Sequence, residues 1–206
     1  MGEIIDRYAE ITTEFRGVAP RLFINLGAGQ FAEQSSSWGL NVPSEGRGLT
    51  CFDYDHDGDI DIALLDHSTG MQFFENQTGV TAQTGYLDLK LVGESPNTDA
   101  IGARVYVLAN LGGVLGWQRQ MRVSEANSNF NSQNIPDLHF GLGAATAIYS
   151  LRIEWPDNTG LVCLNVDPNQ RITFDQRDIL WPKLDLGAPL CTWYPNIAEI
   201  AFEVIE

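Results

Sequence analysis

Residues 51–66 read CFDYDHDGDIDIALLD, an acidic loop that runs directly into an apolar segment. Five aspartates stand at every second position around one glycine: Asp53, Asp55, Asp57, Asp59 and Asp61. Carboxylates this close repel one another unless a cation neutralises them. After the glycine, Ile60, Ile62 and Leu64 alternate along the chain as the residues of a strand do. The stretch therefore predicts a cation-binding loop that leads into a β-strand.

The spacing of the aspartates favours calcium as the cation. Side-chain oxygens from Asp53, Asp55, Asp57 and Asp61 and the main-chain carbonyl of Asp59 supply hard oxygen ligands, which calcium binds in irregular geometry. Magnesium demands stricter octahedral geometry, and zinc prefers His or Cys. Gly58 allows the sharp turn that such a loop needs. An EF-hand would carry Glu at position 12, where this chain has Leu64.

The rest of the chain predicts an all-β fold. Short segments rich in β-branched and aromatic residues, such as YLDLKLV, ARVYVLA and SLRIEW, are bounded by Gly, Asn, Asp or Pro. The C-terminal IAEIAFEVIE has mixed helical and strand periodicity. A Thr-, Gln- and Gly-rich stretch at 75–85 separates two blocks that we expect to pack together.

The charge balance bears on partners and location. A formal net charge of −15 repels phosphate backbones, so we expect no nucleic-acid partner. We also expect no membrane span, because no apolar run approaches about 20 residues. The start MGEIIDRYAE lacks the features of a signal peptide. This leaves a cytosolic protein, or a secreted one whose signal is missing from this sequence; we expect the latter.

Three cysteines are too few for a disulfide scaffold. Cys51 lies in an apolar strand pattern, which predicts a buried thiol. Cys163 and Cys191 could pair and close a loop of about 30 residues. The sequence leaves that disulfide open.

The acidic loop and its surroundings resemble a known repeat. LFINLGAGQFAEQSSSWGL, GRGLTCFDYDHDGDIDIALLD and MQFFENQTG are similar to FG-GAP, or VCBS-type, repeats of integrin-like β-propellers. The resemblance implies a partial propeller-like blade at 20–85 and a structural calcium ion. It implies side-chain ligation by Asp53, Asp55, Asp57 and Asp61, and carbonyl ligation by Asp59.

The second block resembles the ASPIC/UnbV domain, which follows such repeats in the cartilage acidic protein family. NTDAIGARV, SQN, LHFGLG and SLRIEWPDNTG carry the similarity. We therefore expect a β-sandwich or barrel-like domain at 86–174. The blade would pack on this domain, with extensions at 1–19 and 175–206.

Two further features of the second block bear on function. His139 lies between Leu138 and Phe140 with no nucleophile motif nearby, so we expect a hydrogen-bonded structural residue. The loop SEANSNFNSQN, residues 124–134, is either an ordinary surface loop or a polar recognition loop for a glycan or protein. Its candidate ligand-binding residues are Asn127, Asn129, Asn131 and Asn134.

Together these features predict a non-enzymatic, calcium-stabilised extracellular module for binding or assembly. One alternative is a carbohydrate-active or other hydrolytic enzyme whose carboxylates converge in three dimensions. Its candidates are Glu94, Asp99, Glu125, Asp137 and Glu154. Another is a fragment of a larger propeller protein, because one and a half repeats cannot close a ring. An open strand edge would then favour self-association, and YAEITTEF and IAFEVIE could donate capping strands.

Overall fold

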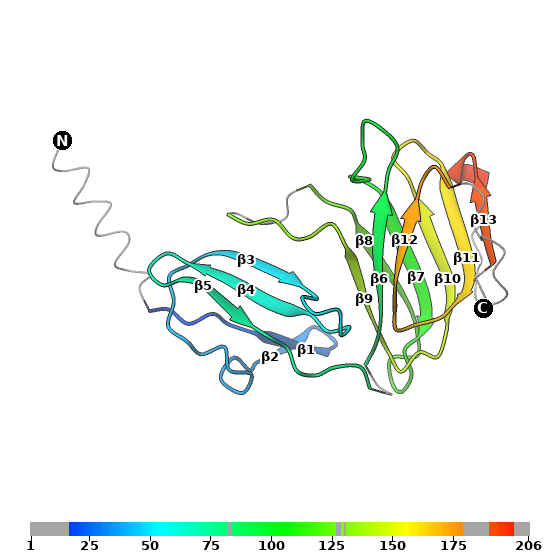
Figure 1. Ribbon diagram of the computed structural model, residues 1–206. Helices are drawn as coiled ribbons and strands as arrows, with labels where there is room; N and C mark the ends of the chain where they lie inside the picture. Colours follow the sequence, from blue (N-terminus) through cyan, green and yellow to red (C-terminus); the bar gives the residue numbers. More distant parts are fainter. Residues whose placement is uncertain (1–16, 82–83, 127–128, 130, 179–189, 200–206) are drawn as a thin grey trace. The chain divides into compact units, whose positions relative to one another are not determined.

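The all-β expectation is confirmed in the computed structural model, which describes residues 17–81, 84–126, 129, 131–178 and 190–199 (Figure 1). These residues form thirteen strands in four sheets and no α-helix, with a single 3-10 turn at Ile197–Glu199. None of the described sheets closes into a barrel or forms a propeller. The same residues contain no helix long and apolar enough to cross a bilayer.

The chain divides into two compact units that each combine separate stretches of sequence. Unit 1 holds the described residues up to Phe52 together with Asp61–Asn76 and the described part of 128–134. Unit 2 holds Asp53–Ile60 together with the described parts of 77–127 and 135–206. The acidic loop is thus grouped with the second block of sequence, and the end of the asparagine-rich loop with the first.

Unit 2 is a sandwich of two sheets around one core (Figure 1). The larger sheet has the order β13-β11-β10-β7-β8, and all of its neighbours are antiparallel. Its strands are β7 (Arg104–Asn110), β8 (Trp117–Val123), β10 (Ile148–Glu154), β11 (Gly160–Val166) and β13 (Leu190–Tyr194). In the smaller sheet β6 lies between a parallel and an antiparallel neighbour. Its strands are β6 (Gly85–Val92), β9 (Leu138–Gly143) and β12 (Gln170–Asp175).

The core of unit 2 comes from the alternating residues that both sheets turn inward. Leu87 and Phe140 of the small sheet and Val105 and Ile153 of the large sheet are fully buried. A core residue of this size contributes about 1.5–3 kcal/mol by leaving water. Trp155 and Pro156 follow directly after β10, where proline cannot continue the ladder.

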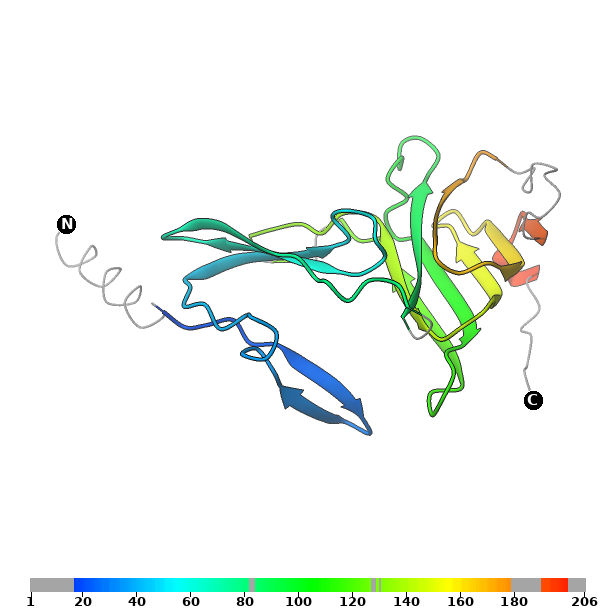
Figure 2. The same ribbon diagram turned by 60° about the horizontal axis from the view of Figure 1, so that its bottom comes forward.

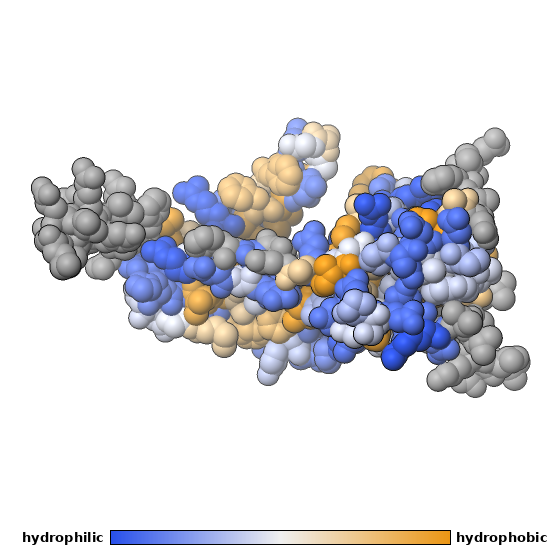
Figure 3. Space-filling model, turned by 90° about the horizontal axis from the view of Figure 1, so that it is seen from above, coloured by the Kyte–Doolittle hydropathy of each residue, from blue (hydrophilic) through white to orange (hydrophobic). Residues whose placement is uncertain are grey.

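Unit 1 contains a two-stranded hairpin and a three-stranded antiparallel sheet. The hairpin, drawn in blue in Figure 2, joins β1 (Phe23–Gly27) to β2 (Gln30–Glu33). The sheet has the order β3 (Gly46–Phe52), β4 (Asp61–Asp66) and β5 (Gly70–Phe74). Large apolar side chains on these strands stay exposed: Phe23, Phe31, Leu49, Leu65 and Met71. Figure 3 shows hydrophobic surface, in tan and orange, on one face of the molecule.

Several expectations about particular segments have a direct outcome. Cys51 was expected to be buried and is instead exposed, because alternation places it on the same face of β3 as Leu49, and that face is exposed. YAEITTEF lies outside the described residues, as does IAFEVIE. The extension at 175–206 supplies β13, which pairs with β11 at the edge of the large sheet.

Candidate functional site

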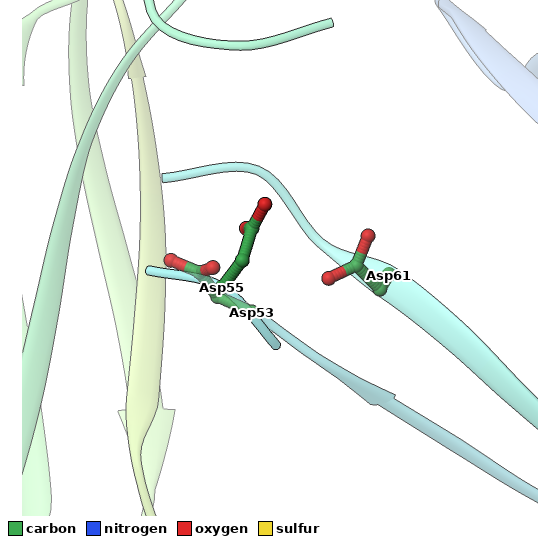
Figure 4. Close-up of side chains that lie close together, drawn as sticks. All are labelled: Asp53, Asp55 and Asp61. Atoms are coloured by element: carbon green, nitrogen blue, oxygen red, sulfur yellow. The ribbon is translucent and has the colours of Figure 1, made fainter. Parts of the chain in front are cut away.

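Asp53, Asp55 and Asp61 form an acidic cluster at the end of the β3–β4 hairpin (Figure 4). One carboxylate oxygen of each residue lies within 4.8 Å of the other two. The pairing of Phe52 with Asp61 closes the hairpin and holds Asp53 and Asp61 at the base of the loop. Three carboxylates that converge in this way could hold a metal ion.

Asp53 is the most informative member of the cluster. Its carboxylate is buried, with 6% of the residue exposed, and its Oδ2 accepts a hydrogen bond from the Gly58 N–H at 3.0 Å. Its Oδ1 is also buried and has no hydrogen-bond partner among the described residues. Burial raises the pKa of Asp53, the Gly58 hydrogen bond opposes this, and the charges of Asp88 and Asp57 reinforce it. A buried carboxylate oxygen without a donor is a group that a cation could neutralise, so the residues fit a metal.

The other two aspartates of the loop use their side chains differently. Asp57 Oδ1 accepts the Asp59 N–H at 3.1 Å, and Asp59 Oδ2 accepts the Gly79 N–H at 2.8 Å. The carboxylate of Asp59 is therefore engaged with the segment that follows β5. Asp61 Oδ1 likewise accepts the Asn76 N–H at 2.7 Å. The bonds of Asp59 and Asp61 thus attach the second half of the loop to residues 76–79.

Gly58 lies against the ring of Tyr86 at the start of β6. Its φ of +93° is in the left-handed region, and a Cβ added there would lie 2.2 Å from Tyr86 Cε1. Both the turn and the close approach therefore require glycine. Burial raises the pKa of Tyr86, and the charges of Asp88 and Asp53 add to this effect.

Polar residues of the small sheet form a network of hydrogen bonds and ring contacts next to the acidic loop. His139 Nδ1 lies 2.8 Å from Asp88 Oδ1, and the His139 ring stacks on Tyr86 at a centroid distance of 6.2 Å. His139 is thus hydrogen-bonded within the sheet, as expected for a structural residue. Arg171 of β12 forms an ion pair with Asp137 and lies 3.1 Å from His56 Nε2 of the loop.

The five carboxylates considered for hydrolysis are not gathered into the acidic cluster. Asp137 is paired with Arg171, and Glu154 with Arg152. Glu154 also accepts a hydrogen bond from the Tyr106 hydroxyl at 3.5 Å. The remaining three are exposed: Glu94, Asp99 and Glu125.

Several side chains of the asparagine-rich loop form hydrogen bonds with β3. Asn129 Nδ2 donates to the Leu49 carbonyl at 2.8 Å, and the Leu49 N–H donates to Ser132 Oγ at 3.1 Å. Asn134 Oδ1 accepts from Thr50 Oγ1 at 3.0 Å and from the Cys51 N–H at 3.4 Å. Asn131 is exposed, and Asn127 lies outside the described residues. The loop therefore satisfies main-chain groups along the outer edge of β3.

Cys163 and Cys191 form a disulfide. They are direct partners across β11 and β13, so the bond ties the C-terminal strand to the large sheet from inside the core. The pairing that the sequence left open is therefore present. Disulfides persist in oxidising compartments, and this one points to such a location.

Sequence reasoning missed the residues that surround the acidic loop. Tyr86, Asp88 and Arg171 come from β6 and β12, distant in sequence from Gly58. Only the fold brings them to the loop, and no local pattern marks them. The strand β13 was also missed, although LCTWY carries the β-branched and aromatic residues typical of a strand.

The comparisons with known proteins bear on unit 2. Residues 93–180 match the family model described as ASPIC and UnbV, a domain of unknown function. The match does not extend to the acidic loop. No curated protein matches the chain. The match overlaps β7 to β12 of the sandwich, and it identifies residues 93–180 of this chain as an ASPIC/UnbV domain.

Proposed function

We propose that this chain is a non-enzymatic, calcium-stabilised module for extracellular binding or assembly. The observation that carries the proposal is the buried Asp53 Oδ1, which lies beside two further carboxylates and receives no hydrogen bond from the part of the chain that the structure describes. Calcium would neutralise this cluster. It takes six to eight oxygen ligands, so Asp57, the Asp59 carbonyl and water would complete the shell.

Two other features support the proposal. The loop joins paired antiparallel strands, as the FG-GAP/VCBS resemblance of 20–85 implies, so an ion there would fix a hairpin. The disulfide suits a secreted protein, for which millimolar calcium and oxidising conditions occur together. In this role the ion is structural and needs no open coordination position for a substrate.

Calorimetric titration tests the calcium site. We expect wild-type protein to bind one calcium ion per chain and Asp55→Asn to lose measurable binding, because the substitution removes a charged ligand. Asp99→Asn is the matched control, since it removes one exposed carboxylate far from the loop in sequence. Unchanged stoichiometry and affinity in Asp55→Asn would overturn the assignment.

A thermal melt tests the structural role of the ion. A ligand that binds only the native state adds RT ln(1 + [L]/Kd), about 2.7 kcal/mol at a hundredfold excess over Kd. The melting temperature in calcium should therefore exceed that in chelator by several degrees. Equal melting temperatures for a protein that binds calcium would contradict a structural role.

We also propose self-association through β5. No described strand pairs with the outer side of β5, whereas the outer side of β3 is occupied by the asparagine-rich loop. Met71 on β5 is 72% exposed. An open edge with apolar side chains favours pairing with another chain.

A further inference from the structure

The outer face of the large sheet in unit 2 differs in chemistry from the rest of this acidic protein. We propose that this face binds a sparsely charged anionic polysaccharide along β8 and β7. The inference rests on the proposed function as a binding module and adds a ligand class and a location. It uses none of the residues of the acidic cluster, so the two proposals can fail separately.

Strand alternation defines which side chains stand on this face. Val105, Val107 and Ala109 of β7 point into the core, so Arg104, Tyr106 and Leu108 point outward. The register places Trp117 opposite Asn110, Arg119 opposite Leu108, and Met121 opposite Tyr106. The outward residues of β7 and β8 therefore stand side by side on one face of the sheet.

Two exposed aromatic rings stand at one end of this face. Trp117 is 51% exposed and Tyr149 is 41% exposed. Their ring centroids lie 5.8 Å apart with an interplanar angle of 86°, so each ring fixes the orientation of the other. Tyr149 lies where the β10–β7 register shifts between Ile148 and Ser150. An exposed, oriented indole ring offers a stacking surface for the C–H face of a pyranose.

The local charge points to an anionic ligand. The chain carries 27 acidic residues, yet none lies in residues 100–124 or 138–153, and Glu154, which the register places opposite Arg104, is paired with Arg152. The first of these stretches contains Arg104, Arg119 and Arg122. Arg104 and Arg119 are exposed and form no ion pair among the described residues, whereas Arg152 is neutralised by Glu154. A guanidinium binds carboxylate or sulfate groups through paired hydrogen bonds.

The spacing of the charges selects between kinds of polyanion. Arg104 lies opposite Val123, four residues along β8 from Arg119, so the two arginines are about 14 Å apart along the strand. Duplex nucleic acid carries one charge per about 1.7 Å, a density that two arginines about 14 Å apart cannot match, and the net charge of −15 repels a polyanion more strongly the denser its charge. A linear sugar polymer with occasional carboxylates matches both the sparse cations and the exposed Trp117.

Affinity electrophoresis in native gels tests the proposal with a matched pair of polymers. We expect carboxymethylcellulose of low substitution to retard the wild-type protein, and hydroxyethylcellulose, the neutral polymer on the same backbone, to retard it at least tenfold less. Trp117→Ala and Arg119→Gln should each weaken retardation by carboxymethylcellulose at least tenfold. Trp117→Phe keeps a stacking ring and should retain binding.

Matched controls separate this face from general effects. Trp38→Ala removes an indole with 52% exposure from unit 1, and Arg21→Gln removes an exposed cation there; both should bind as wild type. All variants should keep the wild-type calcium titration and melting temperature, which would show that they fold. Equal retardation by the two polymers, or wild-type retardation of folded Trp117→Ala and Arg119→Gln, would overturn the proposal.

Discussion

At the scale of single residues, Gly58 decides whether the acidic loop can form. Gly58→Ala should destabilise the protein for two reasons, since φ is +93° and the new methyl would overlap Tyr86 at 2.2 Å. The left-handed backbone alone costs about 1–2 kcal/mol, and the overlap adds to it. Urea unfolding measures the loss, and calcium titration should show weaker binding.

Two further variants separate these causes. In a Tyr86→Ala background the overlap disappears, so Gly58→Ala should then lower the unfolding free energy by only about 1–2 kcal/mol. Gly141→Ala should cost less still, because its Cβ would meet nothing within 4 Å and its φ is not left-handed. An equal cost of Gly58→Ala in both backgrounds would show that Tyr86 does not constrain the loop.

Asp66 makes the stability of unit 1 depend on pH. Hydrogen bonds from the Thr69, Glu45 and Ser68 N–H groups lower its pKa to about 2, from an ordinary value of 3.8. Because the folded pKa is the lower one, its contribution is present above about pH 4 and is lost as pH falls towards 2. The difference in unfolding free energy between wild type and Asp66→Asn should therefore shrink between about pH 5 and pH 2. A constant difference would contradict this linkage.

The sequence alone could predict the aspartates of the acidic cluster but not their surroundings. The spacing around Gly58 is local, so Asp53, Asp55 and Asp61 could be named without a structure. The ring of Tyr86 against Gly58 and the Arg171 contact to His56 depend on long-range strand pairing. The predicted burial of Cys51 was wrong for a different reason. An apolar pattern shows that a segment is a strand, but it says little about which face of a small sheet is covered.

At the scale of elements, several strands of unit 2, among them β6, β7 and β10, could be predicted from alternation, but their partners could not. β12 pairs parallel with β6, more than 75 residues earlier, and no turn chemistry specifies such a pairing. The asparagine-rich loop is a related case. Its composition predicts hydrogen bonding, but only the fold shows that β3 receives the bonds of Asn129 and Asn134.

The edge of β3 offers a prediction at this scale. Asn134→Ala removes the acceptor of the Cys51 N–H, and Ser132→Ala removes that of the Leu49 N–H. Each substitution should accelerate hydrogen exchange at its own amide and cost about 1 kcal/mol per lost bond. Asn131→Ala, at an exposed position of the same loop, should leave both amides protected. Equal exchange rates in all three variants would show that the loop does not protect β3.

The disulfide gives a second prediction for an element. Cys163 and Cys191 are separated by 28 residues, so the bond should stabilise the chain by about 3–4 kcal/mol through the entropy of the unfolded state. Cys163→Ala/Cys191→Ala should lower the unfolding free energy by that amount. Reductant should destabilise wild type and Cys51→Ser alike, since Cys51 is not part of the bond. A double variant as stable as wild type would show that β13 is held by packing alone.

At the scale of the whole molecule, the two units distribute their apolar residues differently. The buried hydrophobic core lies in unit 2, whereas β4 in unit 1 carries Ile62, Ala63, Leu64 and Leu65 in succession. A run that is apolar on both faces is typical of a strand covered on both sides. This pattern favours partners for unit 1, whether they are further repeats of a longer protein or second copies of this chain.

Self-association is the prediction that follows from the open edge of β5. Multi-angle light scattering over a range of concentrations should show a mass that rises above that of one chain, 22.8 kDa. Met71→Lys should reduce the association, because a lysine on an edge strand opposes pairing with a second edge. Val114→Lys adds the same charge at a fully exposed loop position of unit 2 and should associate as wild type. A strictly monomeric wild type at the highest concentration would exclude association through β5, and an equal loss in both variants would assign the effect to net charge.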